Sequence, residues 1–459
     1  MSAPKLFSPG PVMVKENVRQ ALTHYDICHR GAEFEDLFAR TTAKINKLFK
    51  ADDSYRSVII SGSGTSSNET VLSSIFNEGE KVMLIRNGVF GERLLEIIQK
   101  YDIPLVDCEF PWGEEPSMDK VEEMMAADPA IKVVAMVCHE TSTGMINPVK
   151  AVGQLADKYN KWFFVDCVSA AAGELIDVVD FHITFATSVG GKCLGAYPGS
   201  AYICGKIDAF ETLTPEMGKN VYLNLAKHYI SARDKNQTPN TPNVNLFWAL
   251  DVALDNALAD GGVEARVARY KECAGILRKG MKDMGLKLLL DDESKMANTV
   301  TSVFLPEGKD LKAFLKAMEA KGYVVYSGKG KYEEMGMFPW LEEAGIGSII
   351  FSPLAQGLLT GKYLHGIPAG SRATRNHFLK ETSITPELVA KLTALNEIAH
   401  DRGQSLAQMA IAWILRLKGV TSALIGASRP EQIVELAGIG NHLNFTGEEL
   451  ERIEQVLKK

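Results

Sequence analysis

Trp162-Phe163-Phe164-Val165-Asp166 is the stretch that decides the fold, because it is an apolar, strand-forming run that closes on a carboxylate. Similar short runs precede it, and segments with helical periodicity separate them. This alternation predicts a mostly parallel sheet with helices on both faces. The expected strands are Ser57–Ile60, Lys81–Ile85, Val133–Val137 and Trp162–Val165, and the expected helices include Gly91–Tyr101, Pro148–Tyr159 and Leu246–Leu258.

The composition is that of a globular chain whose partners are small molecules. Its 459 residues are 46% hydrophobic and 23% charged, which is enough for two or three domains. The net charge of −7 is spread along the chain without a basic block, which argues against nucleic acid as a partner. No apolar run approaches the roughly 20 residues that span a bilayer, so no membrane association is expected.

The N-terminus and the cysteines both favour a reducing compartment. Met1-Ser2-Ala3-Pro4-Lys5 lacks the apolar core of a secretory signal. The seven cysteines lie far apart without a CxxC pair, so we expect buried small hydrophobic residues and neither a disulfide framework nor a zinc site. The cytoplasm is therefore the expected location.

A glycine-rich loop follows the first expected strand. Ser61-Gly62-Ser63-Gly64-Thr65-Ser66 leads into a helix expected from about Ser67. Glycines let the backbone approach an anion, a helix N-terminus offers free N–H groups, and the hydroxyls of Thr65 and Ser66 add donors. The loop is neither a dinucleotide fingerprint nor a Walker loop. An ordinary glycine turn with a Ser/Thr cap is the alternative at this point.

Lys192 lies in Gly190-Gly191-Lys192-Cys193, downstream of Asp166. Either residue alone is compatible with a solvated surface charge. Together, behind the glycine-rich loop, they suit an enzyme that uses pyridoxal phosphate (PLP). The lysine would form a Schiff base, and the aspartate would keep the pyridine nitrogen protonated so that the ring accepts electrons. With this pair downstream, the loop is best interpreted as a phosphate site.

These residues, in this order, resemble class V (fold-type I) PLP-dependent aminotransferases over roughly residues 5–338. The likeness is strongest to the branch with 2-aminoethylphosphonate–pyruvate, alanine–glyoxylate and serine–pyruvate transaminases. The resemblance implies a large domain over residues 1–255 with a mostly parallel seven-stranded sheet, and a truncated small α/β domain over 256–338. Besides the glycine-rich loop, the matching blocks are Ser8–Pro11, Asn87–Arg93, His139–Gly144, Val165–Ser169 and Lys192–Gly199.

The resemblance assigns roles to residues on the cofactor's phosphate and ring. Gly64, Thr65 and Ser66 would bind the phosphate. Phe90 would stack on the pyridine ring, as an aromatic face can on a cationic ring, and Thr141 would touch the ring hydroxyl. Plain core packing for Phe90 and an ordinary strand position for Thr141 are the alternatives.

Three further roles follow from the same resemblance. Asp166 would pair with the pyridinium nitrogen, and Lys192 would form the aldimine and, once freed, move the substrate α-proton. Thr241 would reach the phosphate of the neighbouring subunit, which implies a homodimer with shared active sites; a simple helix cap is the alternative. Gly191 stands where the family usually has a polar residue, which implies a lost phosphate or substrate contact.

The resemblance breaks after Phe338. The family continues into an Arg-Ile-Gly-like strand whose arginine clamps the substrate carboxylate bidentately. Here the stretch is Met335-Gly336-Met337-Phe338, and Pro339 stands where the arginine is expected. Arg372 and Arg375, beyond the junction, are the alternative candidates for that role.

Residues 339–459 resemble another family, the aldo-keto reductases, through Phe351–Tyr363 and Leu424–Gln432. The segment corresponds to the last two β/α units of an eight-fold barrel. The catalytic Asp, Tyr, Lys and His of that family lie on strands that are missing, and two strands cannot close a barrel, so NADPH binding is not expected. A natural fusion, an engineered chimera and a mis-joined gene are all compatible with this join. The possible NADPH remnant comprises Ser352, Leu354 and Gly357 at the pyrophosphate and Ser428, Arg429 and Gln432 at the 2′-phosphate.

The expected function is transamination. PLP would take the amino group from a small amine or amino acid (2-aminoethylphosphonate, alanine or serine) and pass it to a 2-oxo acid such as pyruvate or glyoxylate. One alternative is an NADPH-dependent carbonyl reductase, which lacks its catalytic tetrad. The other is an inactive PLP-binding or purely structural protein, which Pro339 favours.

Overall fold

The protein is described by a computed structural model that covers residues 5–259, 261–305, 311–320, 323–325, 348–351, 353–368, 371, 373–375, 381–416, 420–425, 427 and 429–458. It divides into two compact units, Met1–Gly330 and Lys331–Lys459. The junction residues Met335–Phe338 and Pro339 lie outside the described residues, as does Arg372. No helix in the described ranges is long and apolar enough to cross a membrane.

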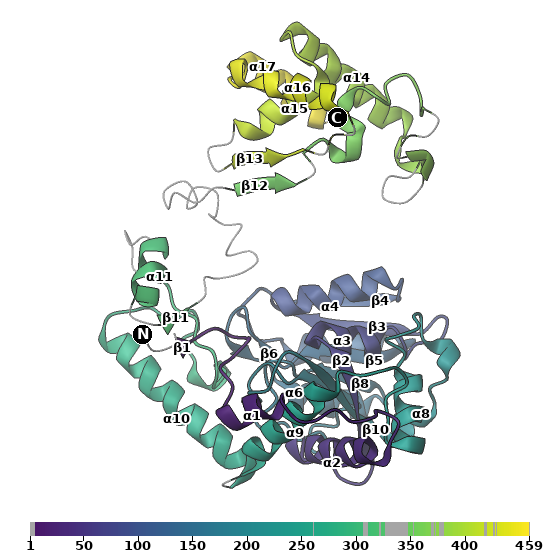
Figure 1. The fold of residues 1–459 in the computed structure, drawn as a ribbon, viewed down its shortest axis with the longest axis vertical. Coiled ribbons are helices and arrows are strands. Elements are labelled where there is room, and N and C mark those ends of the chain that lie inside the picture. Colours follow the sequence, from purple (N-terminus) through teal and green to yellow (C-terminus); the bar gives the residue numbers. More distant parts are fainter. Residues whose placement is uncertain are drawn as a thin grey trace. The chain divides into compact units, whose positions relative to one another are not determined.

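A seven-stranded sheet forms the centre of the first unit, in the order β2-β10-β9-β8-β5-β3-β4 (Figure 1). Only β10 runs antiparallel to its neighbours β2 and β9, so the predicted mostly parallel sheet is confirmed. The strands are β2 (Tyr55–Gly62), β3 (Lys81–Arg86), β4 (Leu105–Glu109), β5 (Ile131–Val137), β8 (Trp162–Asp166), β9 (Phe185–Val189) and β10 (Gly199–Lys206).

The central strands are buried on both faces. In β8, Phe163 and Phe164 point to opposite faces and are both fully buried, and every residue of β9 is buried. Both faces therefore need a cover of helices, as the continuous apolar runs predicted. The helices around this sheet are α1 (Glu16–Ala21), α2 (Ala32–Leu48), α3 (Gly64–Leu72), α4 (Val89–Lys100), α5 (Met118–Ala127), α6 (Val149–Lys158), α7 (Ile207–Glu211), α8 (Leu225–Lys235) and α9 (Val244–Leu258).

Helix α3 begins three residues earlier than predicted. Ser63 caps it, because its hydroxyl accepts from the Ser66 amide at 3.3 Å. Gly64 is the first helical residue, and a Cβ there would lie 2.7 Å from the side chain of Val168. A Ser-Gly-Thr-Ser run has weak helix propensity, so the sequence did not predict a helix here. The close approach of Val168 leaves no room for a side chain at position 64, which explains the glycine. Helices α4, α6 and α9 begin or end within two residues of their predicted limits.

The remaining elements of the first unit surround the sheet domain. Helix α10 (Gly262–Asp283) buries only Val263, Ala274 and Arg278. The predicted domain boundary near residue 255 stays a prediction. The other elements are β1 (Lys5–Leu6), which pairs with β11 (Tyr323–Val324), β6 (His139–Glu140), β7 (Met145–Ile146), α11 (Leu311–Ala320) and the 3-10 helices Pro215–Met217 and Glu293–Lys295.

The described part of the second unit contains two parallel strands, β12 (Ser348–Phe351) and β13 (Val420–Leu424). Its helices pack through Leu392, Ile398, Leu406 and Ile453. Two parallel neighbours joined through helices are what the predicted pair of β/α units requires. The helices are α14 (Pro386–Asp401), α15 (Leu406–Leu415), α16 (Pro430–Ala437) and α17 (Gly447–Lys458), with 3-10 helices at Ala355–Thr360, Ala373–Arg375, Glu381–Ser383 and Gly438–Asn441.

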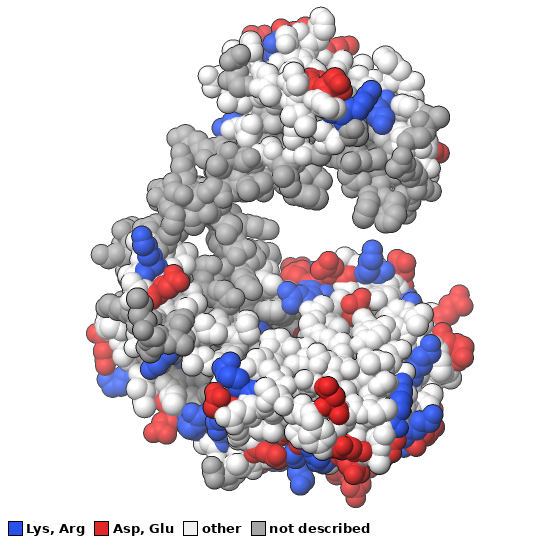
Figure 2. Space-filling model, viewed as in Figure 1, with Lys and Arg blue, Asp and Glu red and all other residues white. Residues whose placement is uncertain are grey.

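The cysteine prediction is right for most positions and wrong for two. Cys108, Cys138, Cys167 and Cys204 are buried, Cys193 is half-buried, and all seven are free thiols. Cys28 and Cys273 are exposed, contrary to expectation. Surface charges of both signs are interspersed on the face drawn in Figure 2, without a continuous basic patch among the described residues.

Candidate active site

The glycine-rich loop presents the N-terminus of α3 at the end of β2. Both the amide and the hydroxyl of Ser66 donate to the Ser63 carbonyl, at 3.0 and 2.6 Å. This carbonyl therefore competes with the phosphate that Ser66 is predicted to bind. The amides of Gly64 and Thr65 donate to no group among the described hydrogen bonds. Open amides at a helix N-terminus are suited to an anion such as a phosphate.

Asp166 is a buried carboxylate at the end of β8. One oxygen accepts from the Asn68 side chain at 2.6 Å and the other from the Val168 amide at 2.8 Å. Asn68 in turn accepts from the Thr187 hydroxyl at 2.5 Å. Burial raises the pKa of Asp166, and these hydrogen bonds oppose the rise. A positive group opposite the carboxylate would favour its ionised form.

Lys192 lies in the turn after β9, against the N-terminal segment. Its Nζ donates to the Pro9 carbonyl at 3.0 Å, and a Cβ on Gly10 would lie 2.6 Å from the lysine side chain. A Cβ on Gly191 would lie 2.8 Å from the Pro198 nitrogen, which explains why glycine precedes the lysine. The tight turn leaves the lysine half-buried and directed at the N-terminal segment.

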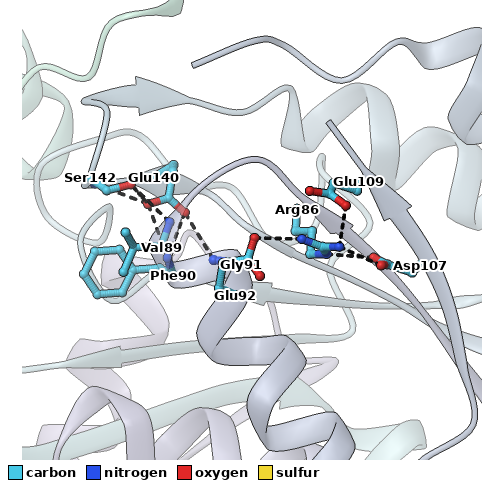
Figure 3. A network of polar contacts seen from close by, with 9 residues as sticks. All are labelled: Arg86, Val89, Phe90, Gly91, Glu92, Asp107, Glu109, Glu140 and Ser142. Carbon is cyan, nitrogen blue, oxygen red and sulfur yellow. Dashed lines mark hydrogen bonds and ion pairs between the residues drawn. The ribbon is translucent and has the colours of Figure 1, made fainter. Parts of the chain in front are cut away.

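Glu140 anchors the first turn of α4, which carries Phe90 (Figure 3). Its fully buried carboxylate accepts from the amides of Phe90 at 3.1 Å and Gly91 at 3.2 Å, and from the Ser142 hydroxyl at 2.5 Å. A Cβ on Gly88 would lie 2.3 Å from Glu140, so the approach needs glycine. Burial raises the pKa of Glu140 against these bonds. The contact fixes the backbone of Phe90.

A second anchor of α4 is the Arg86 cluster (Figure 3). The buried guanidinium of Arg86 bonds both oxygens of Asp107, at 2.8 and 2.7 Å, and reaches Glu109 and Glu92 at 2.7 Å each. Glu92 belongs to α4, whereas the other two carboxylates belong to β4. The three carboxylates hold the pKa of Arg86 above its usual value. The helix is thus tied to the sheet edge as well as to Glu140.

Arg93 is a neighbour shared by several predicted cofactor residues. Its guanidinium lies 4.9 Å from the centre of the Phe90 ring, and one nitrogen is 3.5 Å from the Thr65 hydroxyl. Its positive charge also opposes the rise in the pKa of Asp166. The structure therefore brings Phe90, Thr65 and Asp166 to one place around a cation that the sequence did not single out.

Thr141 and His139 continue the wall of the site. Thr141 is buried, with its hydroxyl 3.4 Å from the His139 carbonyl. His139 Nδ1 lies 3.0 Å from the Ser169 carbonyl, so this nitrogen is the donor. Burial lowers the pKa of His139 to about 4, which keeps the ring neutral and leaves Nε2 as an acceptor. No partner for Nε2 is present among the described residues.

A cavity of about 260 Å³ adjoins this wall. Its lining includes Pro9, Thr141, Ser169 and Cys193, and therefore borders the turn that carries Lys192. Of the predicted cofactor residues Thr141 lines the cavity, whereas Gly64, Phe90, Asp166 and Lys192 do not, so the cavity adjoins the predicted cofactor site without enclosing it.

Thr241 is exposed, two residues before Asn243, whose amide donates to the Ser61 hydroxyl at 3.0 Å. It thus lies close in sequence to a contact with the start of the glycine-rich loop. Its predicted contact with a neighbouring subunit stays a prediction.

The predicted NADPH remnant is only partly described. Ser352 and Ser428 lie outside the described residues. Leu354 and Gly357 lie at the 3-10 helix Ala355–Thr360. Arg429 is exposed at the start of α16, where its amide donates to the Gln432 side chain at 3.2 Å. The prediction that these residues bind no NADPH is untested.

The residues of the first unit fit a phosphorylated pyridine cofactor. The two open amides of α3 suit its phosphate, and the half-buried Phe90 offers an aromatic face. At the buried Asp166, a pyridinium nitrogen would add to the charges of Arg93 and Lys192 in favouring the ionised carboxylate. Asn68, Arg93 and Glu140 were missed by sequence reasoning, although Arg93 and Glu140 lie in blocks that carried the resemblance.

Comparison with known proteins agrees with this geometry. The aminotransferase class-V family model matches residues 6–333, and the aldo/keto reductase family model matches residues 322–458. An uncharacterized aminotransferase of Methanocaldococcus jannaschii is 35% identical over 328 residues, 71% of this chain and 84% of that protein. The 2-aminoethylphosphonate–pyruvate transaminase of Vibrio vulnificus is 31% identical over 331 residues, 71% of this chain and 89% of the relative.

A solved structure supports the same conclusion. Pyridoxamine–pyruvate aminotransferase from Mesorhizobium loti superimposes with a TM-score of 0.67 and 29% identity, covering 72% of this chain and 85% of the other. Family and neighbours together imply dependence on PLP in general, with an amine and a 2-oxo acid as substrates. The chain belongs to the class-V aminotransferase family.

Proposed function

We propose that this protein is a PLP-dependent transaminase. It moves an amino group from a small amine of the 2-aminoethylphosphonate, alanine or serine type to a 2-oxo acid such as pyruvate or glyoxylate. The observation that carries the proposal is that the buried Asp166 interacts electrostatically with Lys192 and accepts a hydrogen bond from Asn68 of α3, whose first two amides are open. When bound, PLP supplies an electron-accepting ring that stabilises negative charge at the substrate carbon.

Each of these residues has its own role toward the cofactor or the substrate. Gly64 and Thr65 hold the cofactor phosphate through their amides. Asp166, kept in place by Asn68, maintains the positive charge of the ring nitrogen. Lys192 would bind the cofactor covalently and, once the incoming amine has displaced it, would carry the substrate α-proton at its Nζ.

Two positions orient the ring. Phe90 stacks on its face from the anchored first turn of α4, and Thr141 contacts its hydroxyl. Thr241 contacts the cofactor phosphate bound in the neighbouring subunit of a homodimer. For the reductase-like unit we propose no reductase activity, because the two strands of its described part cannot close a barrel around a nicotinamide.

Borohydride reduction followed by peptide mapping tests the proposal. A pyridoxyl group on Lys192, together with a spectral change when an amino donor is added, is expected. A label on another lysine, or none, would remove the assignment. A mass measurement in solution tests the dimer separately, since a monomer with full PLP content contradicts the role of Thr241.

A further inference from the structure

The cavity of about 260 Å³ borders the catalytic lysine without containing it. The N-terminal segment provides one wall, including Pro9, whose carbonyl accepts from Lys192 Nζ at 3.0 Å. The turn Cys193–Gly195, directly after the lysine, provides a second, and the start of α10 provides a third. A molecule in this cavity therefore lies next to the group proposed to move the substrate proton.

The cavity is lined by cations and by no carboxylate. Lys15, Arg266 and Arg269 are among the lining residues, and none of the described lining residues is acidic. None of these three cations takes part in the ion pairs found among the described residues. Three positive charges around a small space, without a balancing negative charge, favour an anionic ligand.

The three cations differ in how free they are to bind a ligand. Arg266 donates to the Ala172 carbonyl at 3.1 Å and to the Cys193 carbonyl at 2.6 Å, so it holds the lysine turn against α10. Arg269 is exposed, with its guanidinium 4.9 Å from the centre of the Tyr270 ring. Stacking leaves the edge of a guanidinium available for hydrogen bonds. Arg269 and the exposed Lys15 are thus the cations for a ligand.

His139 is a further polar residue of the cavity lining. Its Nε2 is a buried acceptor without a donor among the described residues. Because Nδ1 donates to the Ser169 carbonyl, a ligand N–H is the kind of group that Nε2 can accept. Nε2 itself is buried behind the cavity wall, so the cations are the groups of this cavity that meet a ligand, and beside Lys192 they match the acid group of a molecule whose amino group reacts at that lysine.

We infer that this cavity receives the acid group of the amino substrate, with Arg269 and Lys15 as its ligands. The site then selects amines that carry a carboxylate or phosphonate over uncharged amines. The inference rests on the proposed function, since it takes the ligand to be the amino donor. It also gives the chain a carboxylate site that does not depend on the arginine absent at Pro339.

Calorimetry of the full chain loaded with PLP tests the inference without turnover. Propionate and ethylphosphonate lack the amino group and do not react, and propionamide is the uncharged control. Both acids should bind the parent at least roughly tenfold more tightly than propionamide, and Arg269→Gln should weaken both by roughly tenfold or more. Lys15→Gln should have a smaller effect, because lysine binds as a single point charge.

Lys279→Gln, on the exposed face of the same helix and outside the cavity lining, is the matched control and should leave acid binding unchanged. Equal affinity in Arg269→Gln and the parent, or equal binding of propionamide and propionate, overturns the inference. Loss of binding for one acid alone identifies that acid as the ligand class. PLP labelling of Lys192 in the same samples separates the two proposals: without a label the proposed function fails, whereas charge-selective binding still supports the cavity.

Discussion

The first unit builds a seven-stranded sheet whose central strands are buried on both faces, whereas the described part of the second unit has a two-stranded parallel sheet. In the first, one continuous core reaches from Val18 to Val263. In the second, the described core consists of smaller separate clusters. A parallel sheet needs enough strands and cover to bring distant loops to one edge. The first unit meets that need and assembles a site, while the described part of the second has two neighbouring strands.

Replacing Lys192 of the first unit should have the largest effect on transamination. Lys192→Ala should reduce transamination at least about 10²- to 10⁴-fold, because it removes the proton carrier and the covalent attachment. Steady-state rates with alanine and 2-aminoethylphosphonate measure this, with the exposed Lys227→Ala as control. Parental rates in Lys192→Ala would place the chemistry elsewhere in the chain.

Core substitutions test whether the two units are independently stable. Phe164→Ala should cost the first unit about 3–5 kcal/mol, and Ile411→Ala should cost the second about 2–5 kcal/mol, because each empties a buried site. Calorimetry should show two unfolding transitions, with each substitution lowering only its own. A single transition lowered by both would mean that the units unfold together.

Each buried histidine of the first unit should contribute a loss of stability in acid, whereas the raised pKa of Glu174, about 7, contributes in the opposite direction. Burial lowers the pKa of His139 and His228 to about 4, so the unfolded chain takes up these protons first as pH falls from about 6.5. The stability present above pH 6.5 is then lost toward pH 4, by about 2 kcal/mol for each histidine between pH 7 and pH 5. Urea unfolding at both pH values measures the loss.

His228 lies on α8 and is not among the residues assigned to the site, so it is the variant to use. His228→Gln should reduce the loss of stability between pH 7 and pH 5 by about 2 kcal/mol and leave transamination at pH 7 unchanged. Unchanged pH dependence in this variant would show that other groups cause the acid loss.

The smallest effect concerns the anchor of α4. Glu140→Gln keeps the shape of the side chain but replaces one acceptor oxygen by an NH₂ group that faces amide N–H groups. It should lower the free energy of unfolding by about 1–2 kcal/mol and weaken PLP binding several-fold. Spectroscopic titration with PLP measures the affinity. Glu92→Gln, on the same helix but bonded to Arg86, should leave PLP affinity closer to the parent value. Equal losses in both variants would indicate general loosening of the helix.

The sequence predicted the sheet well because central parallel strands are continuous apolar runs. Lys81–Ile85 and Trp162–Val165 each match an observed strand to within one residue. The start of α3 was wrong because Gly64 is disfavoured in a helix until Val168 packs against it. That contact joins residues from different elements and leaves no local signal.

The sequence by itself determined the fold class and the family, and it singled out Asp166 and Lys192 as candidate site residues, because these depend on local pattern and residue type. Tertiary structure alone decided which groups surround them. Pro9 meets Lys192 across 183 positions, and Asn68 meets Asp166 across 98. Residues so far apart are brought together only when the strands pair and the helices pack, so their contacts, the cavity and its three cations are properties of the folded chain.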